Sequence, residues 1–143
     1  MPKCYTGRMT DIKVTPFIFF QGNCKEAMTF YQSILGGTLT LKTYGEMMGD
    51  SAPEGWSDKI AYGVLENGAL CLKAWDSKIA NAEARKIELE ISGGDEQKLR
   101  KIFDQLCEGG KAKHPIEEQP SGYFLGRLFD KYGLDWMVTV TKN

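Results

Sequence analysis

The sequence predicts an α+β fold of two βαβββ modules, whose strands form one cupped mixed sheet with the helices on its outer face. Two amphipathic helices, expected over Asn23–Gly37 and Gly94–Gly110, are the first observation. In both, apolar residues recur at i, i+3, i+4 and i+7, which is one stripe of a helix with about 3.6 residues per turn. Each helix follows one predicted strand and precedes three. Because repeated units usually pack against each other, we expect a concave funnel between the modules.

The first half of the first module carries clear strand and helix signals. The apolar, aromatic run Val14–Phe20 is typical of a buried strand. Asn23 with Glu26 three residues later has the pattern of a capping box at a helix start. In Thr38–Tyr44, Leu39 and Leu41 alternate with Thr40 and Lys42, a pattern that predicts the next strand.

The second half of this module is predicted as a loop and a hairpin. Gly45–Ser57 contains glycine, methionine, proline and acidic residues and is expected to be a loop. An Asn-Gly pair between the β-rich runs Lys59–Leu65 and Ala69–Ala74 is a strong hairpin signal. The polar, alanine-rich segment Asp76–Ala84 is the expected linker between the modules.

The second module repeats this order. Lys86–Ile91 alternates apolar and charged residues, as a strand with one buried face does. Lys111–Glu117 contains Pro115, which places it at a sheet edge. Gly122–Phe129 and Leu134–Thr141 predict a final hairpin. Residues 1–143 are thus expected to form a single domain, with modules at 12–76 and 85–142 and a flexible segment at 1–10.

Composition excludes several classes of protein. The chain has 143 residues and a formal net charge of −1, without a run rich in lysine and arginine, so we expect no nucleic-acid partner. It contains no apolar run long enough for a membrane span and no apolar leader, so we expect a cytoplasmic protein without a membrane partner. The four scattered cysteines and single histidine do not predict a zinc site, and the cysteines are expected to be idle thiols.

Several segments together resemble the vicinal oxygen chelate (glyoxalase/bleomycin-resistance/dioxygenase) superfamily, and most closely its PhnB-like branch. The likeness spans residues 12–140 and implies a glyoxalase-like fold. The segments that carry it are Thr15–Asn23, Glu26–Tyr31, Leu35–Gly37, Gly126–Asp130 and Gly133–Met137.

The resemblance also implies where a metal would bind. Enzymes of the superfamily hold a divalent metal on the concave face with His, Gln or Glu ligands from four strands. The matching positions here are Pro16, Cys71, Lys86 and Met137. Proline and methionine are not ligands for a hard divalent ion, and lysine is charged at neutral pH. We therefore expect no catalytic metal and no other cofactor.

Glu88, Glu90 and His114 form an alternative set of metal ligands. The competing interpretation places both glutamates on a solvated strand face, because charged residues are mostly exposed. A histidine can act as a general acid or base near neutral pH, but the place of His114 beside a proline in an edge strand favours a surface histidine.

The funnel is expected to be lined by aromatic, basic and sulfur-containing side chains, as small-molecule sites commonly are. The candidates are Pro16, Phe20, Tyr62, Cys71, Lys73, Trp75, Lys86, Glu88, Arg127 and Met137.

Two of these candidates have competing interpretations. Cys71 is a candidate nucleophile if Lys73 or Lys86 lowers the pKa of its thiol, and otherwise a structural residue. Arg127 is a candidate anion-binding residue, and otherwise forms a salt bridge with an aspartate of the last hairpin, Asp130 or Asp135.

The expected function is metal-independent binding of a small organic ligand in the funnel, by a protein that the resemblance implies is a homodimer. One alternative is a glyoxalase- or dioxygenase-type enzyme with an atypical metal site or a Cys/Lys site. The other is a resistance-type protein that sequesters a drug between aromatic side chains. No catalytic residue is predicted. No glycine-rich loop after a strand is present to hold the nucleoside cofactor of a methyltransferase.

Overall fold

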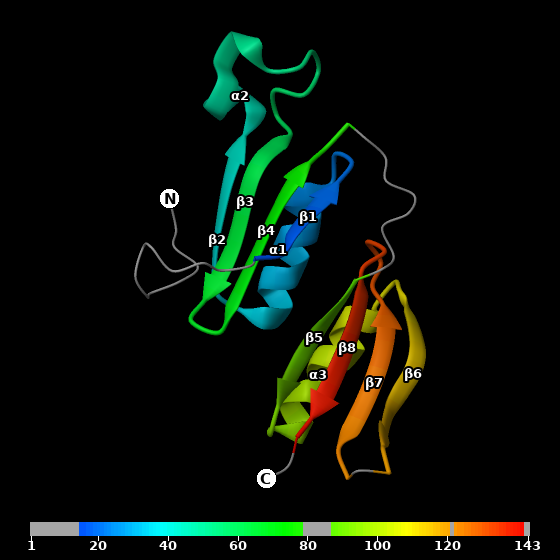
Figure 1. The fold of residues 1–143 in the computed structure, drawn as a ribbon. Helices are drawn as coiled ribbons and strands as arrows, with labels where there is room; N and C mark the ends of the chain where they lie inside the picture. The colour runs from blue at the N-terminus through cyan, green and yellow to red at the C-terminus, as the bar shows by residue number, and fades with distance from the viewer. Residues whose placement is uncertain (1–14, 79–86, 121, 142–143) are drawn as a thin grey trace. The chain divides into compact units, whose positions relative to one another are not determined.

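A computed structural model describes residues 15–78, 87–120 and 122–141. The chain divides into two compact units, Met1–Ala80 and Asn81–Asn143. Each unit is a four-stranded mixed sheet with a helix of 12 residues, in the order βαβββ (Figure 1). The predicted α+β fold class is confirmed. Predictions for residues 1–10 and for Lys86 lie outside the described residues.

The first unit contains strands β1 (Phe17–Phe20), β2 (Thr38–Thr43), β3 (Ile60–Asn67) and β4 (Leu70–Asp76), in the sheet order β1-β4-β3-β2. β1 runs parallel to β4, and the other neighbouring strands are antiparallel. The predicted hairpin between β3 and β4 is confirmed.

Helix α1 (Cys24–Leu35) lies along one face of this sheet (Figure 1). Of the predicted apolar stripe, Ala27 and Tyr31 are fully removed from solvent, whereas Phe30 and Ile34 are only partly buried. Met28, which the stripe did not include, is also fully buried. Removing each large apolar side chain from water contributes roughly 1.5–3 kcal/mol to folding. The helix therefore fixes which face of the sheet is closed and which is open.

The start of α1 is held by Asp76, and the predicted capping box at Asn23 does not form. One carboxylate oxygen of Asp76 accepts hydrogen bonds from the backbone N–H of Gly22 at 2.8 Å and of Cys24 at 2.9 Å. The other accepts from the N–H of Ile60 at 2.8 Å. Asp76 is the last residue of β4 and 1% exposed, so the expectation that it begins the linker is wrong. A cap supplied from 52 positions away leaves no local sequence signal.

The expected loop over Gly45–Ser57 is wrong at its start, where a short helix forms. Helix α2 (Tyr44–Met48) leads into the 3-10 turn η1 (Gly49–Ser51). Thr43 and Glu46 form a reciprocal capping box, with the Glu46 N–H donating to the Thr43 side chain at 3.1 Å. This Thr-x-x-Glu pattern is visible in the sequence and indicates a helix start at this position.

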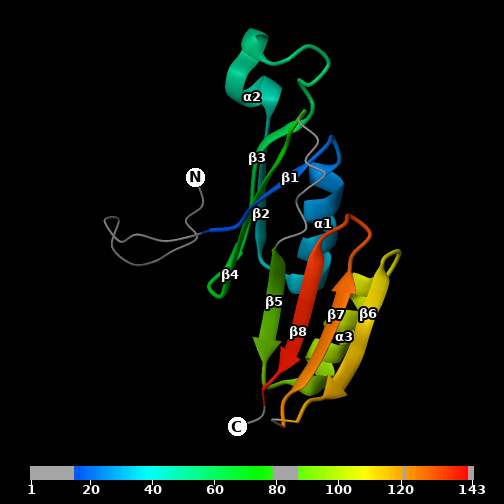
Figure 2. The same ribbon diagram turned by 45° about the vertical axis from the view of Figure 1, so that its right-hand side comes forward.

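The second unit repeats the topology of the first. Strands β5 (Glu88–Gly93), β6 (Lys111–Glu118), β7 (Phe124–Phe129) and β8 (Asp135–Val140) lie in the order β5-β8-β7-β6, with helix α3 (Glu96–Cys107) on one face (Figure 2). β6 is an edge strand, as its proline predicts, and its pairing with β7 is irregular at two places. No helix in the described part of the chain is long and apolar enough to cross a membrane.

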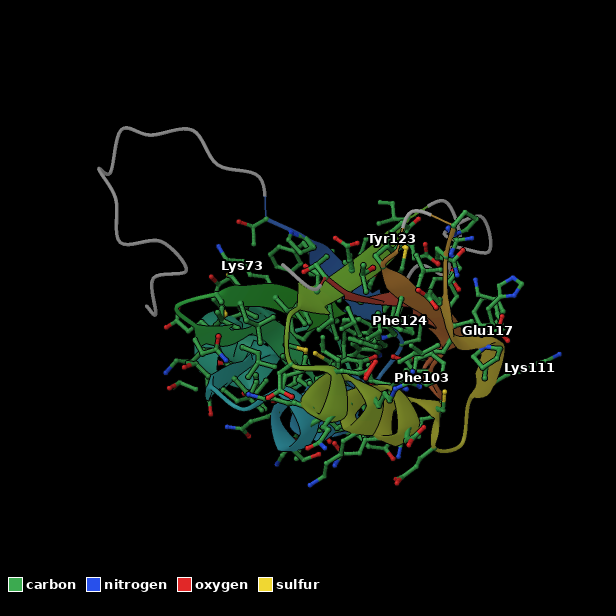
Figure 3. The ribbon with its side chains drawn as sticks, turned by 90° about the horizontal axis from the view of Figure 1, so that it is seen from below. Lys73, Phe103, Lys111, Glu117, Tyr123 and Phe124 are labelled. Carbon is green, nitrogen blue, oxygen red and sulfur yellow. The ribbon has the colours of Figure 1, made fainter. Side chains whose placement is uncertain are left out.

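Helix α3 packs closely on β7 because of a glycine. The side chains of Phe103 and Phe124 lie between the helix and the sheet, while Lys111 and Glu117 lie on the edge strand β6 (Figure 3). A Cβ atom at Gly126 would come within 2.6 Å of Ile116 and 2.8 Å of the Phe103 ring. A glycine is therefore required where the helix approaches the strand.

Candidate functional site

The open face of the first sheet, on the side away from α1, is the candidate site. Along β4, Leu72 and Ala74 are buried, whereas Lys73 and Trp75 are partly exposed. Lys73 points away from α1 (Figure 3). This alternation is that of a strand with one face packed against a helix.

Three aromatic rings and one lysine meet on this face. The Phe17 ring packs edge-on against Tyr62, with centroids 6.1 Å apart and planes at 61°, and against Trp75, at 6.2 Å and 78°. The Lys73 ammonium lies 5.6 Å from the Tyr62 ring centroid. We call Phe17, Tyr62, Lys73 and Trp75 the aromatic face. Its rings remain accessible, since Phe17 is 44% and Trp75 37% exposed.

Pairing between the strands builds the aromatic face. Phe17 on β1 lies directly beside Lys73 on β4, and Phe19 beside Trp75. Residues that pair directly have their side chains on the same side of a sheet. Phe19 is 46% exposed and extends the apolar surface from the same strand.

The expectation that Phe20 lines the concave face is wrong. Phe20 is 5% exposed and pairs with the buried Asp76. Successive side chains of a strand point to opposite faces, so Phe20 belongs to the core while Phe17 and Phe19 face outward. The aromatic run alone did not reveal which alternate residues of the strand are buried. Sequence analysis therefore missed the two outward-facing residues, Phe17 and Phe19.

The open face of the second sheet is ion-paired instead. Arg127 Nε lies 3.4 Å from one carboxylate oxygen of Glu88, and Lys113 Nζ lies 3.9 Å from the other. Lys113 also lies 3.5 Å from Asp135 and 4.2 Å from the centroid of the Phe129 ring. The salt-bridge interpretation of Arg127 holds, but its partner is Glu88 rather than an aspartate of the last hairpin.

The Asp130 side chain forms hydrogen bonds within the turn between β7 and β8. Its carboxylate accepts hydrogen bonds from the backbone N–H of Tyr132 and Leu134, at 2.8 and 3.0 Å. Its second oxygen accepts from the Trp136 indole N–H at 2.8 Å. Asp130 therefore stabilises the last hairpin.

The alternative metal set does not assemble. In the described part of the chain, no group of three or more His, Cys, Asp or Glu side chains converges. Glu88 is engaged by Arg127 and Lys113, and Glu90 accepts a hydrogen bond from the Thr139 hydroxyl at 3.0 Å. His114 is exposed on the edge strand.

The positions that match the superfamily's metal ligands do not fit a hard divalent ion. Pro16 offers only its carbonyl oxygen, which accepts from the Lys73 N–H at 3.1 Å. Cys71 is disulfide-bonded, which corrects the expectation of an idle thiol and leaves no free thiolate there. Met137 provides a thioether, a soft donor, between Glu90 and Arg127 in the sheet.

Two further cysteines are free, and neither is an activated nucleophile. Burial, with a smaller contribution from the Asp76 charge, raises the pKa of Cys24 from 9.0 to about 12. Burial and the nearby Asp104 also raise the pKa of the Cys107 thiol. Both thiols are therefore protonated at neutral pH, and a protonated thiol is a poor nucleophile.

The paired βαβββ units place the chain in the glyoxalase/bleomycin-resistance/dioxygenase class of folds. Solved structures of a glyoxalase/bleomycin-resistance/dioxygenase family enzyme and of a lactoylglutathione lyase match it with TM-scores of 0.62 and 0.56. They cover 87% and 93% of this chain, and 94% and 96% of their own, at 13% identity.

Within this class, the chain belongs to the PhnB-like family whose model is described as 3-demethylubiquinone-9 3-methyltransferase and matches residues 12–139. Protein YjdN of Escherichia coli is 27% identical, over 91% of this chain and 96% of its own. Protein PA1353 of Pseudomonas aeruginosa has a TM-score of 0.82 at 26% identity, covering 93% of this chain and all of its own. A PhnB protein of Bacillus cereus has a TM-score of 0.75 at 23% identity, covering 91% of this chain and all of its own.

Proposed function

We propose that this protein binds small organic ligands, without a metal, on the open face of its first sheet. The observation that supports this function is the aromatic face, where the Phe17 ring contacts the Tyr62 and Trp75 rings and one ammonium group lies over the Tyr62 ring. Ligand sites are typically apolar and aromatic surfaces with a few placed polar groups. The exposed rings of Phe17 and Trp75 leave room for a planar ligand to stack.

Metal independence is argued from the donors at the family's ligand positions. A divalent ion of the kind these folds hold needs carboxylate, carbonyl or imidazole donors. Pro16, the half-cystine Cys71 and Met137 supply no such set. Binding would then come from stacking and charge, and chelators would not affect it.

The test is a fluorescence titration with N-phenylnaphthylamine, a neutral aromatic probe, in the presence and absence of EDTA. We expect saturable binding that EDTA leaves unchanged. Trp75→Ala and Phe17→Ala should each weaken binding by about 2- to 12-fold, the range of one aromatic contact. Tyr123→Ala is the matched control, because Tyr123 is also 37% exposed but lies on the second unit.

Three outcomes would overturn the proposal. They are the absence of saturable binding, binding that Trp75→Ala and Phe17→Ala leave intact, and binding that EDTA abolishes. The last outcome would instead favour the enzyme-like alternative with an atypical metal.

The same proposal includes a homodimer, as the resemblance implies, located in the cytoplasm. Size-exclusion chromatography with light scattering should give twice the mass of the chain. A monomer at micromolar concentration would contradict the dimer and leave the binding proposal in place.

A further inference from the structure

We infer that the ligand is an aromatic anion, a planar ring bearing a carboxylate or sulfonate, whose ring stacks on the aromatic face and whose charge lies at Lys73. This inference rests on the proposed function and specifies its ligand class. The observation behind it is that the Lys73 ammonium lies over the Tyr62 ring, beside Phe17, and has no acidic partner among the described residues.

The residues that pair directly with Lys73 are apolar. Its directly paired neighbours are Phe17 on one side and the buried Val64 on the other. Its ammonium lies over the Tyr62 ring. Among the described residues, Lys73 takes part in no ion pair. Glu66 lies opposite Cys71, towards the hairpin end of the same strands, and forms no ion pair with Lys73.

Lys113 of the second unit shows how this chain holds a lysine that only stabilises a sheet. Lys113 also lies over an aromatic ring, that of Phe129. Two carboxylates, those of Glu88 and Asp135, lie within 4 Å of its ammonium. The two lysines have comparable aromatic settings, but at Lys73 the anionic partner is missing from the described residues. An anionic ligand would supply that partner.

The chemistry favours a ligand that carries ring and charge together. A carboxylate or sulfonate accepts charge-assisted hydrogen bonds from an ammonium, and such bonds are stronger where apolar groups exclude water. The ring of the same ligand would meet Phe17 and Trp75 edge-on or offset, the geometries that aromatic pairs prefer. A simple inorganic anion would gain only the first contact and a neutral arene only the second.

The test compares two probes that differ only in the anionic group, anilinonaphthalene sulfonate and the neutral N-phenylnaphthylamine. For the wild-type protein we expect the sulfonate to bind about ten-fold or more tightly than the neutral probe, as one charge-assisted hydrogen bond gives. Lys73→Met should remove this preference, so that the two probes bind within about two-fold of each other. Lys25→Met, an exposed lysine on α1 with the same change in charge, should keep the preference.

The outcomes separate this inference from the proposed function. Equal binding of both probes to the wild type, or an unchanged preference in Lys73→Met, would overturn the aromatic-anion inference while leaving aromatic binding intact. A preference lost equally in Lys25→Met would show that net charge, not Lys73, selects the anion, and would also overturn it. Failure of both probes to bind would overturn the proposed function itself.

Discussion

Replacing Asp76 with alanine is expected to destabilise the first unit by about 3–5 kcal/mol. The Asp76 carboxylate accepts three backbone hydrogen bonds, from Gly22, Cys24 and Ile60, at 2.8–2.9 Å. These bonds join the start of α1 and the start of β3 to the end of β4. Alanine would remove all three acceptor contacts at once.

The magnitude follows from how deeply each donor is buried. The hydrogen bonds from Cys24 and Ile60 are buried, whereas the one from Gly22 is partly exposed and water can replace it. Each buried donor without a partner costs about 1–3 kcal/mol, so two give most of the predicted loss. Asp76→Asn keeps one carbonyl oxygen for Gly22 and Cys24 but turns an amide N–H toward Ile60. It should cost about 1–3 kcal/mol.

Two measurements test this prediction. Urea denaturation gives the free energy of unfolding of Asp76→Ala and Asp76→Asn, with Glu54→Ala as an exposed acidic control expected within about 0.5 kcal/mol of wild type. Alkylation of the native protein, followed by peptide mass mapping, should label Cys24 faster in Asp76→Ala because the helix start opens. If Asp76→Ala unfolds like the control and Cys24 stays protected, the carboxylate does not hold the helix start.

Three further predictions concern other contacts. Because the pKa of Cys24 is raised from 9.0 to about 12 in the folded protein, its contribution to stability is complete below about pH 9 and falls by up to about 1.4 kcal/mol per pH unit above it. Urea melts in alkaline buffer should show this loss in wild type, and an equal loss in Cys24→Ala would contradict it. Gly126→Ala should cost about 1–3 kcal/mol by overpacking. Gly93→Ala, whose new Cβ would lie 3.7 Å from a side chain, should cost clearly less in the same melts. Lys113→Met should destabilise more than Arg127→Met, which breaks one exposed pair worth under about 1 kcal/mol; equal losses would argue against a Lys113 network.

Much of the fold could be predicted because its signals are local. The apolar stripe of α3, including Leu99 and Leu106, follows a period that neighbouring residues display. The edge position of β6 follows from Pro115, which cannot donate a ladder hydrogen bond. Along β4, the alternation of Leu70, Leu72 and Ala74 with Lys73 predicts that the lysine lies on the side away from the helix, as the structure shows.

The candidate site was predicted only in part. Lys73 was named from the alternation of its strand, and Tyr62 and Trp75 were named as aromatic residues of the concave face; Lys73 lies over the Tyr62 ring, and Trp75 contacts Phe17 on the same face. Phe17 was missed and Phe20 was placed on the wrong face, because a strand of four apolar residues does not show which alternate residues face the core.

The sequence by itself determined the order of elements, the two amphipathic helices, the turns and the character of each strand face. These depend on residues within about four positions of one another, so the chain displays them directly. Only the tertiary structure decided that Asp76 caps α1, that Arg127 forms an ion pair with Glu88, and that Phe17 lies beside Lys73 on the neighbouring strand. The physical reason is strand pairing, which brings distant residues into contact and selects partners from several chemically equivalent candidates.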